Sequence, residues 1–308
     1  MSLQLVIDRL SKTYPNGVRA LRDVSLAIPT GMFGLLGPNG AGKSTLMRTL
    51  ATLQDADSGT ATLGAIDVLA DKDAVRRRLG YLPQDFGVYP KVSAQDMLDH
   101  LARLKGIVNG GERRDVVATL LRQVNLLDVR KKPLGGFSGG MRQRFGIAQA
   151  LIGNPVLVIV DEPTAGLDPE ERVRFHNLLA EIGENVIVIL STHIVSDVSD
   201  LCARMAIINK GEVLLTGDPA TLTAALDGRV WQKAVARDEL DAAKAAFPVV
   251  ATRLVAGRTL VTAVAADAPG DGFRPIEASL EDVYFAAIAG RFGVAPPPAP
   301  SSAPPLAA

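Results

Sequence analysis

Residues 37–44 read Gly37-Pro38-Asn39-Gly40-Ala41-Gly42-Lys43-Ser44, which matches the pattern G-x-x-x-x-G-K-[ST] of a phosphate-binding loop, the Walker A motif. Met32–Leu36 before the loop predicts a buried strand, and Lys43 to about Leu53 predicts a helix. Glycines let backbone N–H groups come close to anionic oxygens, and a helix presents its positive dipole end to the same anion. Lys43 is therefore expected to reach the β- and γ-phosphates of a triphosphate, and the Ser44 hydroxyl to bind Mg²⁺.

An acidic pair, Asp161 and Glu162, ends the apolar run VLVIVDE farther along the chain. The carboxyl ends of parallel strands are where ligands bind in open α/β sheets. Asp161 is expected to hold Mg²⁺, directly or through water, and Glu162 to polarise the attacking water. Acidic pairs after strands are also common as plain helix starts, but a phosphate loop upstream in the same chain favours the functional interpretation.

The pattern of apolar residues predicts an α/β fold. Continuous Val/Ile/Leu runs at 156–160, 186–190, 205–209 and 212–216, separated by helical segments, indicate a parallel sheet covered on both faces. Residues 3–8 and 24–28 predict two short strands joined by a turn at Tyr14–Gly17, and 79–83 predicts another strand. Helical spacing of apolar residues predicts a helical insertion at about 93–127 and a helix at 140–153.

Composition excludes several classes of protein. Lys and Arg number 33 and Asp and Glu number 33, so there is no bulk attraction to nucleic acid, and no nucleic-acid partner is expected. The single cysteine, Cys202, cannot form an intrachain disulfide, which favours a reducing, cytoplasmic setting. The first residues lack the pattern of a secretory signal, and the strongest apolar runs, at 156–160 and 186–190, fall far short of the roughly 20 residues of a spanning helix.

Residues 137–143, Phe137-Ser138-Gly139-Gly140-Met141-Arg142-Gln143, resemble the signature sequence LSGGQ of the ABC (ATP-binding cassette) family. Other family landmarks follow in family order over about residues 3–217: the adenine-stacking aromatic Tyr14, the glutamine loop at Gln84, the D-loop Ala165-Gly166-Leu167-Asp168 and the switch histidine His193. Each landmark alone is a weak signal, since a lone histidine or tyrosine is usually structural. Together and in order they are specific.

The resemblance implies ATP and Mg²⁺ as ligands and assigns a role to each matching residue. Glu162, His193 and Lys43 would be catalytic, and Ser44, Gln84 and Asp161 would hold the metal. The nucleotide would be bound by Tyr14, Gly37, Pro38, Asn39, Gly40, Ala41, Gly42, Lys43, Ser44, Thr45, Gln84, Ser138, Gly139, Gly140 and Asp168.

In this family the signature sequence of one subunit closes over ATP held by a second subunit, so the resemblance implies a homodimer. Phe137 stands where the family usually has Leu, and Met141 where it has Gln. The backbone donors and Ser138 remain, and a helix N-terminus binds anions, so the site is expected to survive. Two competent ATP sites are therefore expected.

The expected fold is that of a P-loop NTPase of the ABC cassette type, with a mostly parallel sheet, an antiparallel β subdomain and a helical subdomain. The cassette would occupy residues 1–217, with its helical subdomain at about 90–150. Residues 218–294 would form a small α+β accessory domain, with strands at about 231–236, 249–255 and 259–264 and helices at about 239–247 and 279–291. The Pro/Ala-rich tail at 295–308 is expected to be disordered.

The segment Glu277–Tyr284 (EASLEDVY) resembles the segment that closes many ATPases of ABC-2 exporters, although a plain amphipathic terminal helix would also account for it. The resemblance implies a separately encoded membrane permease and a peripheral location on the cytoplasmic face of the membrane. The apolar loop at 85–92 beside Gln84 is expected to dock the permease, unless its apolar side chains pack beneath the helical insertion.

Two other functions fit parts of the sequence. A soluble ABC protein acting on ribosomes or DNA would carry two cassettes, long coiled coils or zinc-binding cysteines, and this sequence has one cassette and one cysteine. A small P-loop kinase would leave the signature sequence and His193 unexplained. The sequence does not identify the cargo, because cargo selectivity would lie in the permease.

Overall fold

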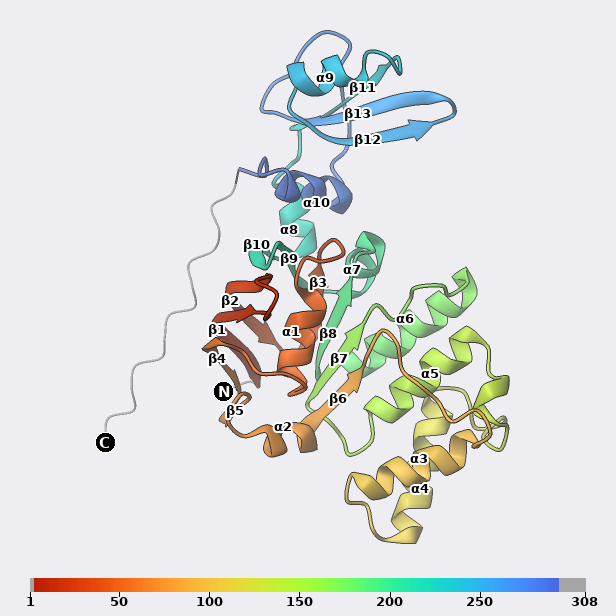
Figure 1. Ribbon diagram of the computed structural model, residues 1–308. Helices are drawn as coiled ribbons and strands as arrows, with labels where there is room; N and C mark the ends of the chain where they lie inside the picture. Colours follow the sequence, from red (N-terminus) through yellow and green to blue (C-terminus); the bar gives the residue numbers. More distant parts are fainter. Residues whose placement is uncertain (1–2, 294–308) are drawn as a thin grey trace, which may run out of the picture.

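A computed structural model describes residues 3–293, so the expected disorder of the tail at 295–308 lies outside the described residues. The central sheet has the order β10-β9-β3-β8-β7-β6 (Figure 1). Its strands are β3 (Gly31–Leu36), β6 (Leu79–Leu82), β7 (Leu157–Asp161), β8 (Ile187–Thr192), β9 (Arg204–Asn209) and β10 (Glu212–Gly217). The first five are mutually parallel, as the apolar runs predict.

The sixth strand corrects the prediction, because β10 runs antiparallel to β9. Only a tight turn joins the two strands, and its residues Lys210 and Gly211 both have positive φ, at 50° and 83°. Such a turn closes a hairpin, whereas a parallel connection needs a crossover of a dozen or more residues.

An antiparallel sheet of order β2-β1-β4-β5 lies beside the central sheet (Figure 1). Its strands are β1 (Gln4–Thr13), β2 (Arg19–Pro29), β4 (Ser58–Leu63) and β5 (Ile66–Asp67). The first two are longer than predicted. The sequence does not predict β4, because only Ala61 and Leu63 of its six residues are buried and the alternation of apolar and polar residues is weak.

Helices cover the central sheet: α1 (Lys43–Leu50), α2 (Lys72–Arg78), α6 (Pro169–Gly183) and α7 (Val195–Leu201). The helical subdomain contains α3 (Ala94–Leu104), α4 (Gly110–Gln123), a 3-10 turn at Leu134–Gly136 and α5 (Gly139–Ala150). The predicted insertion is thus two helices, since Gly106 turns the chain at φ 93° and Asn109 caps α4 by accepting from the N–H groups of Gly111 and Glu112.

A third sheet, of order β12-β13-β11-β14, lies at the far end of the molecule (Figure 1). This part contains α8 (Pro219–Ala224), β11 (Val230–Val235), α9 (Leu240–Ala246), β12 (Val249–Val255), β13 (Arg258–Val264), β14 (Arg274–Pro275) and α10 (Leu280–Ile288). Val235, Val261 and Phe273 form a small core of its own. Ser279 and Asp282 form a capping box at the start of α10. Val283 of α10 belongs to the same apolar cluster as Val198 of α7, so this helix packs on the cassette.

Candidate functional site

The site lies where the carboxyl ends of three neighbouring parallel strands meet. In the order β3-β8-β7, Leu36 pairs with Thr192, and Ser191 pairs with Asp161. Gly37 follows the first strand, His193 the second and Glu162 the third. Three segments far apart in sequence therefore place their functional groups at one edge of the sheet.

The phosphate-binding loop leads directly into α1. Gly42 is the N-cap residue, with φ at 107°, a conformation that favours glycine. A Cβ at this position would also lie 2.4 Å from the carbonyl oxygen of Ala20, so the close approach of β2 excludes a side chain. The first turn of α1, Lys43-Ser44-Thr45, opens into a cavity, where the helix dipole favours an anion.

The buried Lys43 and Glu162 form one polar network with the exposed His193. Lys43 Nζ donates to the carbonyl oxygens of Gly37 (2.7 Å) and Pro38 (3.3 Å) and lies 3.3 Å from Glu162 Oε1. Glu162 Oε2 lies 2.6 Å from His193 Nδ1. Lys43 and Glu162 are each 6 % exposed, so their opposite charges are held in a weakly screened environment.

Glu162 has a left-handed backbone, with φ at 51°. For a non-glycine residue this conformation costs about 1–3 kcal/mol and persists only where its surroundings enforce it. One restraint is the hydrogen bond from the Glu162 N–H to the Ser191 carbonyl oxygen, at 2.8 Å. The twist turns the Glu162 side chain toward Lys43 and His193.

The cavity has a volume of about 660 Å³, within the range of small-molecule sites. Most residues predicted to bind nucleotide line it, although Gly37 does not: Tyr14, Pro38, Asn39, Gly40, Ala41, Gly42, Lys43, Ser44, Thr45 and Gln84. The predicted catalytic Glu162 lines it too. The prediction missed Arg19, Arg22 and Lys210, which add positive charge to the wall. Arg19 and Arg22 lie near the start of β2, and Lys210 lies in the β9–β10 turn. In the sequence, only their proximity to turns could have indicated that they reach the cavity.

Tyr14, which follows the end of β1, is one of the residues that line the cavity. Its hydroxyl lies 3.2 Å from Thr45 Oγ1 and donates to Gln54 Oε1 at 3.1 Å. These bonds tie the hydroxyl to α1 and to the segment after it, and the ring offers an aromatic surface that a base can stack on.

The oxygen groups expected to hold Mg²⁺ suit that ion. Ser44 and Gln84 line the cavity and offer a hydroxyl and an amide oxygen. Asp161, at the end of β7, is 2 % exposed, and its Oδ1 has no hydrogen-bond partner among residues 3–293. A buried carboxylate oxygen without a partner is costly, so a cation would stabilise it. Burial and the nearby Asp161 carboxylate also raise the pKa of the Tyr81 hydroxyl.

The predicted signature residues lie outside this cavity. Ser138 and Gly139 are exposed at the N-terminus of α5, where Ser138 Oγ accepts from the Met141 N–H at 3.2 Å. Gly140 is buried, and a Cβ there would meet Glu171. Asp168 is exposed and caps α6 by accepting from the Glu171 N–H. This chain therefore surrounds its own cavity without these four residues.

Comparison with known proteins assigns this arrangement to a family. A family model described as "ABC transporter" matches residues 21–165. The daunorubicin/doxorubicin resistance ATP-binding protein DrrA of Streptomyces peucetius is 37% identical over 223 residues, which cover 72% of this chain and 67% of DrrA. The chain belongs to the ABC transporter family.

Other members of the family are longer than this chain. The probable multidrug ABC transporter ATP-binding protein YbhF of Escherichia coli is 36% identical over 73% of this chain and 39% of its own length. The ABC transporter A family member 7 of Arabidopsis thaliana is also 36% identical, over 73% of this chain and 25% of its own length. The chain thus spans only a quarter to two fifths of these two relatives.

Solved structures of ATP-binding cassettes have the same fold. One is the dimeric cassette MJ0796 in a post-hydrolysis state bound to ADP and Pi, with a TM-score of 0.63 and 27% identity over 70% of this chain and 98% of that one. Another dimeric structure of MJ0796 gives the same values. The predicted fold, an ABC cassette with a mostly parallel sheet, is confirmed.

Proposed function

We propose that this chain binds and hydrolyses ATP as the energy-supplying subunit of an ABC transporter, of the ABC-2 exporter type. The observation that carries the proposal is the meeting of Lys43, Glu162 and His193 beside a cavity that ends on a helix N-terminus. The drug-resistance and multidrug names of DrrA and YbhF, together with the EASLEDVY segment on α10, support the exporter assignment.

In this mechanism Lys43 exchanges its contacts with Glu162 and the loop carbonyls for the β- and γ-phosphate oxygens of ATP. Glu162 is then free to accept a proton from the water that attacks the γ-phosphorus, while the bond to the β–γ bridging oxygen breaks and ADP leaves. His193 holds Glu162 in place through its Nδ1. Mg²⁺, held by Ser44, Gln84 and Asp161, would neutralise charge on the phosphates.

ATP binding is proposed to join two copies of the chain. Ser138 and Gly139 are exposed, lie outside the cavity of their own chain, and form the N-terminus of a twelve-residue helix. A second anion site of this kind suits the phosphates of ATP held by another copy. The dimeric state of MJ0796 supports this arrangement.

Mixing two inactive variants tests the shared site. Lys43→Ala and Ser138→Arg chains should each be inactive as homodimers. A heterodimer places both lesions in one site and leaves the other intact, so ATPase activity should return to at most about half of wild type if the sites act independently. Mixing two batches of the same variant is the control. Absence of recovery, with heterodimers demonstrated by differential tags, would contradict the arrangement or show strict coupling of the sites.

The transporter role requires a membrane subunit. Within residues 3–293 no helix has the length and apolarity that crossing a bilayer requires. In the loop beside Gln84, Phe86 and Val88 pack against the core, as the alternative interpretation predicts, whereas Tyr89 is 66 % exposed. We propose a peripheral location on the cytoplasmic face of the membrane, reached through contacts with a separately encoded permease.

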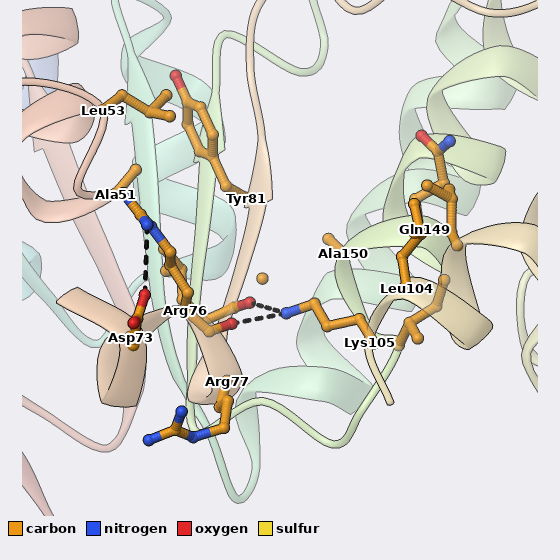
Figure 2. Close-up of a pocket in the computed structure, with 14 residues that line it drawn as sticks. Ala51, Leu53, Asp73, Arg76, Arg77, Tyr81, Leu104, Lys105, Gln149 and Ala150 are labelled. Atoms are coloured by element: carbon orange, nitrogen blue, oxygen red, sulfur yellow. Dashed lines mark hydrogen bonds and ion pairs between the residues drawn. The ribbon is translucent and has the colours of Figure 1, made fainter. Parts of the chain in front are cut away.

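A groove of about 630 Å³ between the sheet and the helical subdomain suits that contact (Figure 2). Leu53 and Leu104 line it and are 63 % and 71 % exposed. Lys105 extends across it and donates to the carbonyl oxygens of Arg76 and Leu79, and burial lowers the pKa of its ammonium. Apolar walls with a basic rim fit a short amphipathic permease helix that carries an acidic residue.

Substitution in the groove tests the docking proposal. Leu104→Glu should lower co-purification of the permease about tenfold, because a buried anchor of this size contributes about 1–2 kcal/mol to binding. ATP affinity should not change. Leu254→Glu is the matched control, since this leucine of β12 is 73 % exposed and does not line the groove. Equal co-purification of Leu104→Glu and wild type would place the docking site elsewhere.

A further inference from the structure

A second polar network is centred on Asp197, a carboxylate in the first turn of α7 with no exposed surface. Its Oδ2 accepts from Thr164 Oγ1 at 2.5 Å. Its Oδ1 accepts from Arg172 Nε at 2.8 Å and lies 2.9 Å from His176 Nε2, which must carry a hydrogen to pair with it.

These bonds join three segments next to residues of the proposed site: the segment after β7, α6 and α7. Thr164 is two residues after Glu162, and Asp197 is four residues after His193. Arg172 and His176 come from α6, which begins directly after Asp168. The Glu162–His193 and Thr164–Asp197 hydrogen bonds are thus two links between the segment after β7 and the segment after β8 that continues into α7.

The backbone of Glu162 explains why a second link is required. Its φ of 51° is strained, and such a conformation relaxes unless both flanks are held. The N–H bond to Ser191 holds the side facing β7. On the other side, Thr164 holds the loop through Asp197. A buried carboxylate is costly unless several donors satisfy it, and the donors from Thr164, Arg172 and His176 meet that requirement.

We propose that Asp197, acting through Thr164, is a positioning residue that sets Glu162 against His193 for hydrolysis. The proposal rests on the ATPase function proposed above. It assigns to α7 a role in catalysis that does not involve contact with ATP: the helix carries the anchor for the loop of the general base. Misplacing a base by about 1 Å can cost about a hundredfold in rate, so loss of this anchor should lower turnover rather than binding.

Thr164→Val tests the link, because it removes the hydroxyl and keeps the shape of the side chain. We expect kcat to fall about tenfold with KM for ATP unchanged and Tm lowered, since the buried Asp197 loses a donor, and Thr164→Ser, which keeps the hydroxyl, to retain most of the activity. Thr262→Val is the matched control: a buried threonine of β13, far from the site, that should leave kcat unchanged.

A double-mutant cycle identifies the route. Asp197→Ala should also lower kcat, and adding Thr164→Val to it should cause no further loss, since each change alone removes the hydrogen bond between Thr164 and Asp197. Wild-type kcat in Thr164→Val, an equal loss in Thr164→Ser, or additive losses in the double variant would overturn the proposal. If the wild-type chain itself does not hydrolyse ATP, the proposed function fails instead, so the two failures are distinguishable.

Discussion

Glu162→Gln should bind ATP as tightly as wild type while its turnover falls about 10²–10⁴-fold, because an amide oxygen is a poor proton acceptor. The substitution keeps the size of the side chain, so the packing around a residue that is 6 % exposed should be preserved. One amide cannot reproduce the carboxylate's contacts with both Lys43 and His193. ATP that is bound but not hydrolysed should then hold two copies together.

Two measurements check this result. Phosphate release gives the turnover, and gel filtration with ATP and Mg²⁺ should show a dimer for Glu162→Gln that disappears without nucleotide. Glu181→Gln, an exposed glutamate on α6, is the matched control and should behave as wild type. A Glu162→Gln chain that hydrolyses ATP at the wild-type rate would remove Glu162 from its role as general base.

Lys43→Met should lower both ATP affinity and turnover, with turnover falling about 10²–10³-fold, because Lys43 meets phosphate charge in the ground state and in the transition state. Methionine retains the apolar stem of the buried lysine, so the loss reports the missing ammonium rather than a cavity. The substitution also leaves the Glu162 carboxylate without its nearest positive charge. Isothermal titration and phosphate release together measure the two losses.

The matched control for Lys43 is Lys105→Met, which removes an exposed lysine that also donates to backbone carbonyls, in the other cavity. It should leave ATP affinity unchanged. If Lys43→Met binds and hydrolyses ATP as wild type does, then the assignment of residues 37–44 to phosphate binding is wrong.

The parts of the site that were predictable are those whose chemistry is encoded in consecutive residues. A phosphate needs successive backbone donors followed by a helix, so the pattern at 37–44 specifies it locally. The run at 156–162 likewise encodes a buried strand and the acidic pair at its carboxyl end. The helical spacing of apolar residues in α3 and α5 is likewise specified by residues close together in the chain.

Several features of the fold and the site could not be predicted from the sequence, because they depend on residues that are distant in the chain. The strands β4 and β5 are mostly polar and are stabilised by pairing with β1 and with each other. The antiparallel course of β10 depends on two positive φ values in the turn before it. Arg19, Arg22 and Lys210 reach the cavity only because the β1–β2 and β9–β10 turns fold over the phosphate loop.

The sequence by itself determined the phosphate loop, the acidic pair, the order of the family landmarks and hence the ABC cassette fold, since each of these depends on residues close together in the chain. Only the tertiary structure decided that β8 lies between β3 and β7, that His193 meets Glu162 across 31 positions, and that Asp197 anchors Thr164. The physical reason is that strand order and side-chain pairing depend on which surfaces pack together, and hydrogen bonds form only within about 3 Å.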